Sequence, residues 1–595
     1  MLERLRGLYC AVALSFRADW RRALLLAALF GLRPLSPIAT AYGIKLVIDA
    51  IRLDQARTAI EASLAVALVT AVGLVGSFYG VRVSTRLIEV TMRDLDLELM
   101  AISTRVPGIE HHERPEHLDR LELIASERIH LAEGADVSSL LLGSILRMGA
   151  TAVVLALVSP WLLTIPLLAI PTLISGSRAE RSRQRALTAT AAESRRAKHF
   201  FELATTTPPA KELRLSGLQT ELVARHDAGL RLVNRSFDRA AILGMVITLA
   251  GWLGFGLGYA AIAIFVVRLA LAGAVTLGEV GLILTLIASI SAQMSNAIRY
   301  TNAVNRALAA GSRLLELRDW AKEASAVPRG SQKAPARVSR GVELKGIRFR
   351  YPGQKNDVLK SLDLVLPTGA LVGIVGENGA GKTTLMKLLT RMYEPTEGQI
   401  LVDGVELRDI ELESWRARCS AAFQDFARFE LLLRETVGVG HLPDLDDRAA
   451  VTRAIEQAAA TDVVAALDDG LDAELGQSFA SGTDLSGGQW QKLALARSMM
   501  RPAPALLVLD EPTAAIDAEA EHALLERYAS AAKSLGAASG TVTLFVSHRL
   551  TSLRHADLVV VLDAGEAVEV GTHEALVAKG GIYANLYTRQ ARAYL

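Results

Sequence analysis

The sequence predicts two fold units in one chain. An N-terminal all-α domain has six transmembrane helices with long cytoplasmic helical extensions, and a C-terminal α/β domain follows it. Hydrophobic residues make up 51% of the 595 residues, and the mean hydropathy of +0.29 is too high for an ordinary soluble protein. Six apolar stretches of about 20 residues precede position 300, whereas short apolar strands alternate with helical patterns after position 340.

Charge and cysteine content exclude several classes of function. The formal net charge is +2, so the overall electrostatics do not favour a nucleic-acid partner. The two cysteines, Cys10 and Cys419, form no CxxC pair, and no histidines cluster at metal-ligand spacing. We therefore expect neither a disulfide framework nor a structural zinc site, and we expect both thiols on the reducing side of the membrane.

Residues 1–20 carry an apolar stripe at helical spacing, formed by Leu2, Leu5, Tyr9, Val12 and Phe16. Arginines beside the stripe interrupt the first apolar stretch, which argues against a cleavable signal peptide. We predict an amphipathic helix lying along the inner membrane interface. The alternative is a frayed cytosolic leader.

The predicted transmembrane domain covers residues 21–320. Its spans lie near residues 23–48, 60–83, 137–158, 161–178, 240–267 and 273–298. The connections after the second and fourth spans run for roughly 50 to 60 residues, far longer than ordinary loops. Because their pattern is helical, these connections should continue the membrane helices outward.

The distribution of basic residues predicts the orientation. Many arginines and lysines lie in the connection from Arg178 to Arg239, whereas the short turn at Ser159 and Pro160 carries none. By the positive-inside rule, both termini and both long connections face the cytoplasm. The C-terminal domain is then cytoplasmic too.

Polar residues inside the spans mark a candidate substrate cavity. Arg33 and Arg147 fall near the middle of the bilayer, and Gln293, Asn296 and Arg299 recur every three residues on the sixth helix. Ionisable groups at such depth are costly, which favours a function in a polar translocation path. The alternative is that the arginines pair with acidic neighbours or extend to the interface.

A composition shift to Pro, Ser, Ala and basic residues marks a linker at 321–340. The second domain, residues 341–595, then alternates apolar strands with helices, which predicts a mostly parallel sheet. Its strand ALVGIV leads into a phosphate-binding loop of the form GxxxxGK[ST]. The loop and its first helical residues are Gly376, Glu377, Asn378, Gly379, Ala380, Gly381, Lys382, Thr383 and Thr384.

Each part of this loop has a reason in the chemistry of phosphate binding. Glycines let the backbone curl so that its N–H groups point inward, and the following helix N-terminus adds positive potential. Lys382 is placed to reach the β and γ phosphates, and the Thr383 hydroxyl to ligate Mg²⁺. A second buried strand, ALLVL, ends in Asp510 and Glu511. Asp510 can hold Mg²⁺ through water, and Glu511 can orient and polarise an attacking water.

The segment Leu485–Gln489 reads LSGGQ at the start of a helical pattern and matches the signature of the ABC transporter superfamily. The chain resembles exporter-type (type IV) half-transporters with fused membrane and ATPase domains, over nearly its whole length. The resemblance implies ATP and Mg²⁺ as cofactors. It assigns Tyr351 to adenine stacking, Gln424 to the Q-loop, Asp517 to the D-loop and His548 to the switch histidine.

The same resemblance completes the list of site residues. Catalysis is assigned to Glu511, His548, Gln424 and Lys382, and magnesium binding to Thr383, Gln424 and Asp510. Segments 110–121 and 202–214 resemble the short coupling helices that dock near the Q-loop. The signature residues that bind nucleotide are Ser486, Gly487, Gly488 and Gln489.

The resemblance also implies a dimer. The family architecture places the signature helix far from the phosphate loop of its own chain, so Ser486 and Gly488 serve ATP bound to Lys382 of a partner chain. A homodimer is expected, because one chain carries a full set of motifs. A heterodimer with a related chain is the alternative.

The implied function is ATP-driven export across a bacterial plasma membrane. The stretches FQDFARFELLLRETV, TDLSGGQWQKLALARSMM and ANLYTRQARAYL resemble exporters of lanthipeptides and related ribosomal peptides, without their peptidase domain. We therefore expect a peptide or natural-product substrate. The alternatives are a lipid or multidrug exporter, an importer of the same architecture, and an ATP-gated channel or regulator.

Overall fold

The computed structural model describes residues 2–32, 35–162, 170–206, 209–325, 330–512, 518–547 and 549–593. They divide into two compact units. The helical unit comprises residues 1–104 and 119–320, and the α/β unit comprises residues 105–118 and 321–595. The division falls after Trp320, and residues 105–118 belong to the second unit, which was not predicted.

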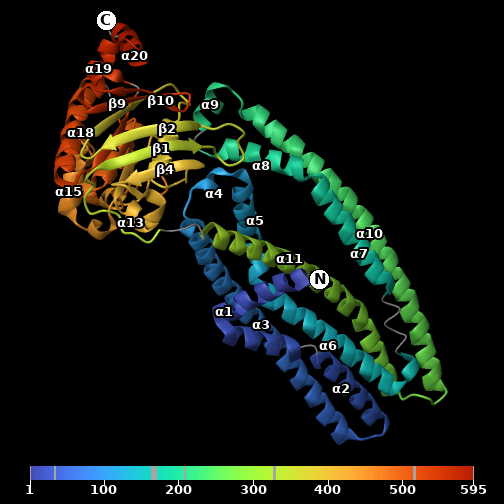
Figure 1. The fold of residues 1–595 in the computed structure, drawn as a ribbon. Coiled ribbons are helices and arrows are strands. Elements are labelled where there is room, and N and C mark those ends of the chain that lie inside the picture. Colours follow the sequence, from blue (N-terminus) through green and yellow to red (C-terminus); the bar gives the residue numbers. More distant parts are fainter. Residues whose placement is uncertain are drawn as a thin grey trace. The chain divides into compact units, whose positions relative to one another are not determined.

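Long helices make up the helical unit (Figure 1). Three of them, α3, α10 and α11, have 50, 53 and 49 residues. At 1.5 Å per residue such helices are about 75 Å long, more than twice the hydrocarbon thickness of a bilayer. They therefore extend well beyond the membrane, as the long connections predicted. The helices of this region are α1 (Leu2–Leu32), α2 (Leu35–Arg52), α3 (Ala56–Arg105), α5 (Pro115–Ala132), α6 (Gly134–Val158), α7 (Ile170–Ala189), α8 (Ala191–Thr205), α9 (Ala210–Leu215), α10 (Gln219–Leu271) and α11 (Leu277–Ser325).

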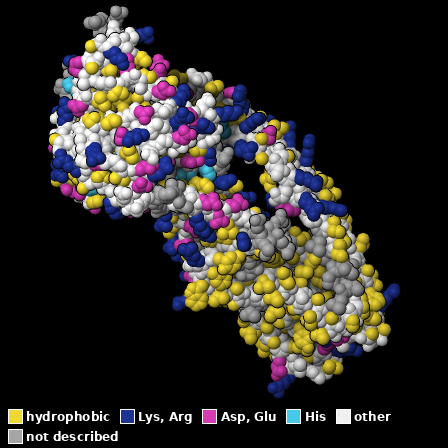
Figure 2. Space-filling view, viewed as in Figure 1, with side chains coloured by type: hydrophobic (Ala, Val, Ile, Leu, Met, Phe, Trp, Pro, Cys, Tyr) yellow, Lys and Arg dark blue, Asp and Glu magenta, His cyan; other side chains and the backbone are white. Residues whose placement is uncertain are grey.

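Within the described ranges, five helical segments are long and apolar enough to cross a membrane. They are Leu5–Arg52, Ala56–Arg105, Gly134–Val158, Gln219–Leu271 and Leu277–Ser325. The first four contain one predicted span each, and Leu277–Ser325 contains most of the span predicted at 273–298. The remaining prediction, 161–178, includes residues 163–169, which lie outside the described residues, and it stays a prediction. Figure 2 shows hydrophobic side chains gathered over the surface of the helical unit, as expected for a face in contact with lipid.

The N-terminal helix α1 bends at Asp19, where φ is −157° and ψ is 91°. Its first arm packs against α11 so closely that a Cβ on Gly7 would lie 2.4 Å from the carbonyl oxygen of Leu308. Leu5 and Tyr9 of the predicted apolar stripe are exposed, at 55% and 76%. The arm is thus an ordered helix with one packed face and one exposed apolar face. Its position at the membrane interface remains a prediction.

Helices α7 and α10 run side by side (Figure 1). A Cβ on Gly251 would lie 2.2 Å from Oγ of Ser175 and 3.0 Å from the carbonyl oxygen of Pro171. Gly244 approaches Ala179 in the same way, because a Cβ added to Gly244 would lie 3.3 Å from the Cβ of Ala179. Small residues therefore bring the two backbones together, as they do in other membrane helix pairs.

Two sheets form the α/β unit. A four-stranded antiparallel sheet has the order β2-β1-β4-β5, and a six-stranded sheet has the order β10-β9-β3-β8-β7-β6. Only β10 is antiparallel in the larger sheet, so the predicted mostly parallel sheet is confirmed. The strands are β1 (Gly341–Phe349), β2 (Leu359–Pro367), β3 (Leu371–Val375), β4 (Glu397–Val402), β5 (Val405–Glu406), β6 (Cys419–Ala422), β7 (Leu506–Asp510), β8 (Val542–Val546), β9 (Leu558–Asp563) and β10 (Glu566–Gly571).

Every residue of β3, β7 and β8 is buried, which explains their continuous apolar sequences. The carboxyl ends of such strands meet at one edge of the sheet, where ligands bind in open α/β folds. The helices of this unit are α4 (Glu110–Glu113), α12 (Lys382–Leu389), α13 (Leu412–Arg416), α14 (Leu433–Gly438), α15 (Arg448–Gln457), α16 (Thr461–Ala465), α17 (Gly487–Met499), α18 (Ala518–Ser539), α19 (His573–Lys579) and α20 (Ile582–Ala593).

The predicted linker at 321–340 is only partly a linker. Helix α11 continues to Ser325, and residues 326–329 lie outside the described part of the chain. The backbone N–H groups of Ser331 and Gln332 donate to the carbonyl oxygen of Asp409, at 2.9 and 3.0 Å. The second half of this segment is therefore tied to the surface of the α/β unit, because the polar backbone of an extended segment satisfies its hydrogen bonds there.

Candidate functional site

The phosphate loop runs from the end of β3 to the start of α12 and depends on glycine at fixed points. Gly379 and Gly381 have φ values of +86° and +101°, in the left-handed region. A Cβ on Gly376 would lie 2.3 Å from the carbonyl oxygen of Leu562. The N–H of Ala380 donates to the carbonyl oxygen of Glu377 at 3.1 Å, which tightens the turn. The two fixed glycines of the pattern GxxxxGK[ST], Gly376 and Gly381, are thus required by this backbone path.

Lys382 closes the loop. Its Nζ donates to the carbonyl oxygens of Gly376 and Glu377, at 2.7 and 3.0 Å. Burial lowers the pKa of Lys382 below its ordinary value, although the nearby carboxylates of Glu511 and Asp510 act to raise it. The Lys382 ammonium is therefore held beside the backbone of the phosphate loop. The next residue, Thr383, is exposed at the start of α12.

Glu511 is fixed through its backbone at the carboxyl end of β7. Its φ is +48°, a conformation that non-glycine residues rarely adopt. The N–H of Glu511 donates to the carbonyl oxygen of Val546 at 3.0 Å, and Nε2 of Gln491 donates to the carbonyl oxygen of Glu511 at 2.9 Å. Nε2 of Gln424 donates to Oε2 of Glu511 at 3.1 Å. The structure thus brings together two of the predicted catalytic residues.

Asp510 precedes Glu511 and is 5% exposed. Burial, and secondarily the Glu511 carboxylate, raises the pKa of Asp510 to about 6. The nearby Lys382 ammonium offsets these effects only in part. A raised pKa of this kind is common for carboxylates in functional sites, including those that act on a metal-bound water.

Tyr351 lies over the first turn of α12. Its hydroxyl shares a hydrogen bond of 3.1 Å with Oγ1 of Thr384, which is buried. Its ring meets Phe349 and Tyr393 edge-on, with centroids 4.9 and 5.3 Å apart. The residue predicted to stack on adenine is therefore held beside the phosphate loop, and the stacking itself remains a prediction.

The signature segment starts α17. Ser486 caps the helix: its Oγ accepts from the N–H of Gln489 at 3.3 Å, and Oε1 of Gln489 accepts from the N–H of Ser486 at 2.8 Å. A Cβ on Gly487 would have no neighbour within 4 Å, so this chain's own packing does not require glycine there. Gly488 follows, partly buried. In the described part of the chain, no hydrogen bond joins this segment to the loop 376–383.

Three predicted site residues, Arg33, Asp517 and His548, lie outside the described residues. Their roles stay predictions.

Two features near the phosphate loop carry no sequence motif. A cavity of about 650 Å³ is lined by Gly376–Asn378 together with Arg589 and Gln590 of α20. Oε1 of Gln590 accepts from the N–H of Leu550 at 2.6 Å, which anchors the helix there. Arg589 therefore adds a cation to the surroundings of the loop. Gln491 is a further site residue that no sequence motif predicts, because its contact with Glu511 depends on tertiary packing.

The segment 105–118 docks onto the α/β unit through Glu113 of α4. Oε1 of Glu113 accepts from Nζ of Lys387 at 2.6 Å, and Oε2 accepts from the hydroxyl of Tyr393 at 2.5 Å. Burial alone would raise the pKa of Glu113, but these two hydrogen bonds hold it below its ordinary value. Nζ of Lys387 also lies 5.6 Å from the ring centre of Tyr351. The first predicted coupling segment thus contacts the aromatic group at the phosphate loop.

The second predicted coupling segment, 202–214, belongs to the helical unit and includes residues 207 and 208, which the structure does not describe. Its docking stays a prediction.

The helical unit contains a cavity of about 480 Å³ on which three of the predicted substrate residues, Arg147, Gln293 and Asn296, converge. Arg299 is not among the lining residues. It is exposed, donates a hydrogen bond to Asn296, and its guanidinium lies 5.8 Å from the ring centre of Tyr300. Each step of three residues falls about 60° short of a full turn, so two such steps turn Arg299 about 120° away from Gln293. The other lining side chains combine hydroxyls with apolar groups: Ser36, Thr40, Thr70, Ser77, Ser144, Thr285, Phe30, Leu74 and Leu140.

Comparison with known proteins gives consistent matches. A family model described as ABC transporter matches residues 359–514. An ATP-dependent lipid A-core flippase from Xanthomonas campestris pv. campestris is 31% identical over 508 residues, which cover 84% of this chain and 82% of the relative. A protein of the same name from Chromohalobacter salexigens is 35% identical over 321 residues, 54% of this chain and 53% of its own length.

A solved structure of a bacterial Atm1-family ABC exporter with ATP bound is similar to the present fold. The TM-score is 0.70 at 23% sequence identity, and the match covers 96% of this chain and 98% of that chain. This similarity supports the predicted fold class of a helical membrane domain followed by an α/β ATPase domain.

Proposed function

Because the chain belongs to the ABC transporter family of exporters, with ATP hydrolysis coupled to transport, we propose that it moves a lipid-like amphiphile out of the cytoplasmic leaflet. It is a multi-pass protein of the inner membrane with a cytoplasmic ATPase domain. The relatives that match most of its length are named lipid A-core flippases. That name favours a lipid over the peptide substrate that the sequence suggested.

The observation that carries this proposal is the 480 Å³ cavity in the helical unit. Its wall places Arg147 and several hydroxyls beside the apolar side chains of Phe30, Leu74 and Leu140. Such a mixture suits a molecule with both a polar group and hydrocarbon chains. A wholly polar solute would leave the apolar wall without a partner.

The residues of the phosphate loop fit ATP and Mg²⁺. The loop curls around Lys382, its glycines occupy positions where a Cβ would clash or strain the backbone, and Thr383 is exposed at the helix start. Among the described residues, no group of three or more His, Cys, Asp and Glu side chains is placed to hold a metal ion by itself. Thr383, Gln424 and Asp510 would therefore hold Mg²⁺ together with phosphate oxygens. Bound Mg²⁺ would neutralise charge on the phosphates during hydrolysis.

The roles of this chain's residues in hydrolysis follow from their contacts. Gln424 bonds to Glu511 and fixes the direction of its carboxylate. Glu511 then orients a water and accepts its proton as the water attacks the terminal phosphate. The exposed N-terminus of α17 supports a site completed by a second chain. A homodimer is the proposed assembly, since this chain carries both halves of such a site, and a heterodimer is its alternative.

The substrate class can be tested in vesicles that contain the purified protein with its ATPase domain outward. A fluorescent phospholipid in the outer leaflet should become protected from an external quencher after ATP is added, because export carries it to the inner leaflet. ATP-dependent accumulation of a cationic peptide, without lipid protection, would favour the peptide alternative. Accumulation in the reverse sense would favour an importer, and ion conductance without accumulation would favour a channel.

A further inference from the structure

A groove of about 260 Å³ lies between the N-terminal arm of α1 and the last turns of α11. Arg6, Cys10 and Arg17 line it from α1 at intervals of four and seven residues, which keeps them on one face of that helix. Leu315 and Arg318 line it from α11. The groove is therefore built by two helices that are distant in the sequence.

The part of the groove between the arginines of α1 is apolar. Ala13, Leu14 and Leu315 line it there, and Cys10 and Leu14 are buried. Tyr9, on the same wall, is exposed. Such a surface suits a hydrocarbon chain better than a polar solute, because a polar solute would leave the apolar wall without a partner.

Arg318 shapes the groove without adding net charge to it. Its Nε and Nη2 donate to the two carboxylate oxygens of Glu98, at 2.5 and 2.7 Å. Its Nη1 donates to Sγ of Cys10 at 3.3 Å. The guanidinium of Arg318 is thus held on every side, and Glu98 compensates its charge.

Arg6 and Arg17 supply positive charge that remains uncompensated. Both are exposed, and in the described part of the chain no hydrogen bond or ion pair engages either side chain. Eleven residues separate them, which is about three helical turns or 16 Å, so they share one side of α1. The nearby acid Asp19 is already paired with Arg22, with 2.6 Å between Oδ2 and Nη1. None of the described residues that line the groove is acidic.

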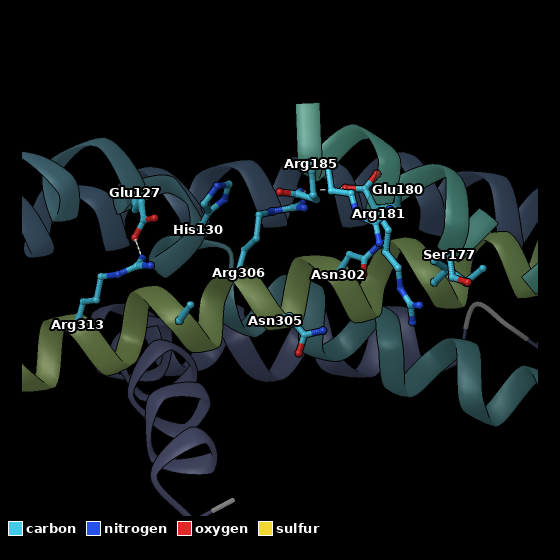
Figure 3. A pocket seen from close by; sticks show the side chains of 13 residues that line it. Glu127, His130, Ser177, Glu180, Arg181, Arg185, Asn302, Asn305, Arg306 and Arg313 are labelled. Carbon is cyan, nitrogen blue, oxygen red and sulfur yellow. Dashed lines mark hydrogen bonds and ion pairs between the residues drawn. The ribbon is translucent and has the colours of Figure 1, made fainter. Parts of the chain in front are cut away.

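A larger cavity of the same unit, between α5, α7 and α11, shows the difference (Figure 3). Its volume is about 680 Å³, and its wall mixes arginines with carboxylates. Glu127 is paired there with Arg313, and Glu180 accepts from Nη2 of Arg183 at 3.0 Å. Part of its positive charge is thus compensated within the protein, unlike the charge of the groove beside α1.

The contacts of α1 place the groove at the cytoplasmic boundary of the predicted spans. A Cβ on Gly134 would lie 2.7 Å from the carbonyl carbon of Ala11, and Oγ of Ser15 donates to the carbonyl oxygen of Ala132 at 3.3 Å. Gly134 is the first residue of α6 and precedes the span predicted at 137–158 by three residues, or about 4.5 Å. This depth is that of the headgroups of the cytoplasmic leaflet, where anionic lipids lie.

The positive-inside rule accounts for basic residues at this boundary. It does not account for two arginines on one helix face with an apolar groove between them. A lipid with an anionic headgroup does account for this arrangement, because it offers both a hydrocarbon chain and a phosphate.

We infer that this groove binds an anionic glycerophospholipid of the cytoplasmic leaflet. An acyl chain lies along Ala13, Leu14 and Leu315, and Arg6 and Arg17 hold the phosphate. The lipid is a resident partner of α1 and not the transported molecule. The inference therefore does not depend on the proposed function.

Native mass spectrometry of the purified, nucleotide-free protein tests the site, because it counts the lipids bound to the intact assembly. The protein in detergent would be titrated with phosphatidylglycerol, with phosphatidylcholine of the same chains, and with glycerol 1-phosphate, which has no chain. We expect one phosphatidylglycerol per chain to bind about tenfold or more tightly than phosphatidylcholine. Glycerol 1-phosphate should bind far more weakly, because it leaves the apolar groove empty.

The variant R6Q/R17Q should bind one phosphatidylglycerol fewer per chain. R21Q/R82Q is the matched control: it removes two exposed arginines near the same membrane boundary that do not line the groove, and it should keep the wild-type number. A lipid in the membrane cavity would add a bound molecule that neither variant affects. The number of phosphatidylglycerol molecules per chain therefore separates the groove from the transport path.

Two further variants separate charge from shape. A13F fills the apolar part of the groove while both arginines remain, and it should weaken phosphatidylglycerol binding several-fold. R6K/R17K keeps the charge and should retain most of the binding, so it remains informative even if the glutamine variant folds poorly.

An unchanged number of bound phosphatidylglycerol molecules in R6Q/R17Q, or an equal loss in R21Q/R82Q, would overturn the inference. Equal binding of the two lipids to the wild type, or glycerol 1-phosphate that binds as tightly as phosphatidylglycerol, would overturn it as well. Dissociation of the assembly in R6Q/R17Q with the lipid number unchanged would assign the groove to a contact between chains instead. Failure of lipid transport in vesicles would refute the proposed function and leave this site intact.

Discussion

Glu511 combines an unfavourable backbone conformation with several fixed contacts. A φ of +48° costs on the order of 1 kcal/mol or more for a residue with a side chain. Val546 and Gln491 hold the backbone, and Gln424 holds the carboxylate. Strain that neighbouring groups maintain in this way is typical of a catalytic residue, because it directs one side chain toward one point.

Replacing Glu511 by Gln should keep the shape of the site and remove its base. We expect ATP binding and nucleotide-dependent dimer closure to persist, while hydrolysis falls by about a hundredfold or more. Phosphate release and binding of labelled ATP would be measured on the same preparation. Appreciable residual turnover would refute the role of Glu511.

Asp510 should make the metal-free protein less stable as the pH rises. Its pKa is raised from 3.8 to about 6, so the folded chain binds more protons than the unfolded chain between these values. Stability is therefore lost as the pH rises from about 4 through 6. The D510N variant should be more stable than the wild type at pH 7, by roughly 2 to 3 kcal/mol at most, and no more stable near pH 3.

Thermal unfolding of both proteins in the absence of Mg²⁺ would measure this difference. A pH-independent difference would contradict the raised pKa. Addition of Mg²⁺ and ATP should stabilise the wild type more than D510N.

At the scale of elements, α4 is the clearest case of a short segment that belongs to a distant unit. Its sequence is far from the ATPase domain, yet Glu113 bonds to Lys387 and Tyr393 there. The resemblance to coupling helices predicted docking, but not these partners. They depend on tertiary contacts between positions more than 250 apart, for which local sequence patterns carry no signal.

Weakening this contact should separate ATP hydrolysis from transport. In E113Q the ion pair with Lys387 is lost, which for a partly exposed pair costs about 1 kcal/mol or less. We expect lipid transport per ATP hydrolysed to fall several-fold while hydrolysis persists. E110Q is the matched control, because Glu110 pairs with Arg114 within its own segment. Equal effects of the two variants would contradict a coupling role for Glu113.

For the whole molecule, the sequence predicted what local rules determine. The phosphate loop was predictable because its glycines and Lys382 are set by one short backbone path. The predicted membrane helices follow from apolar length. Arg299 does not line this cavity although Gln293 and Asn296 do, because two helical steps of three residues turn Arg299 about 120° away from Gln293. The contact of Gln491 with Glu511 was not predicted, because these two residues meet only in the folded unit.

The proposed dimer has a sharp test at this scale. K382A and S486R should each abolish hydrolysis alone. If Lys382 of one chain works with Ser486 of its partner, a mixed dimer retains one intact site, and a randomly mixed preparation recovers about a quarter of wild-type activity. No recovery on mixing would indicate that each site is completed within one chain.

The central claim is that ATP hydrolysis drives the movement of an amphiphile across the bilayer. Its most direct test is to record lipid protection and phosphate release together in the same vesicles, with the wild type and with E511Q. The account predicts that lipid moves only with hydrolysable ATP, in proportion to the phosphate released, and not with E511Q. Lipid movement at the same rate without ATP, or with E511Q, would contradict it.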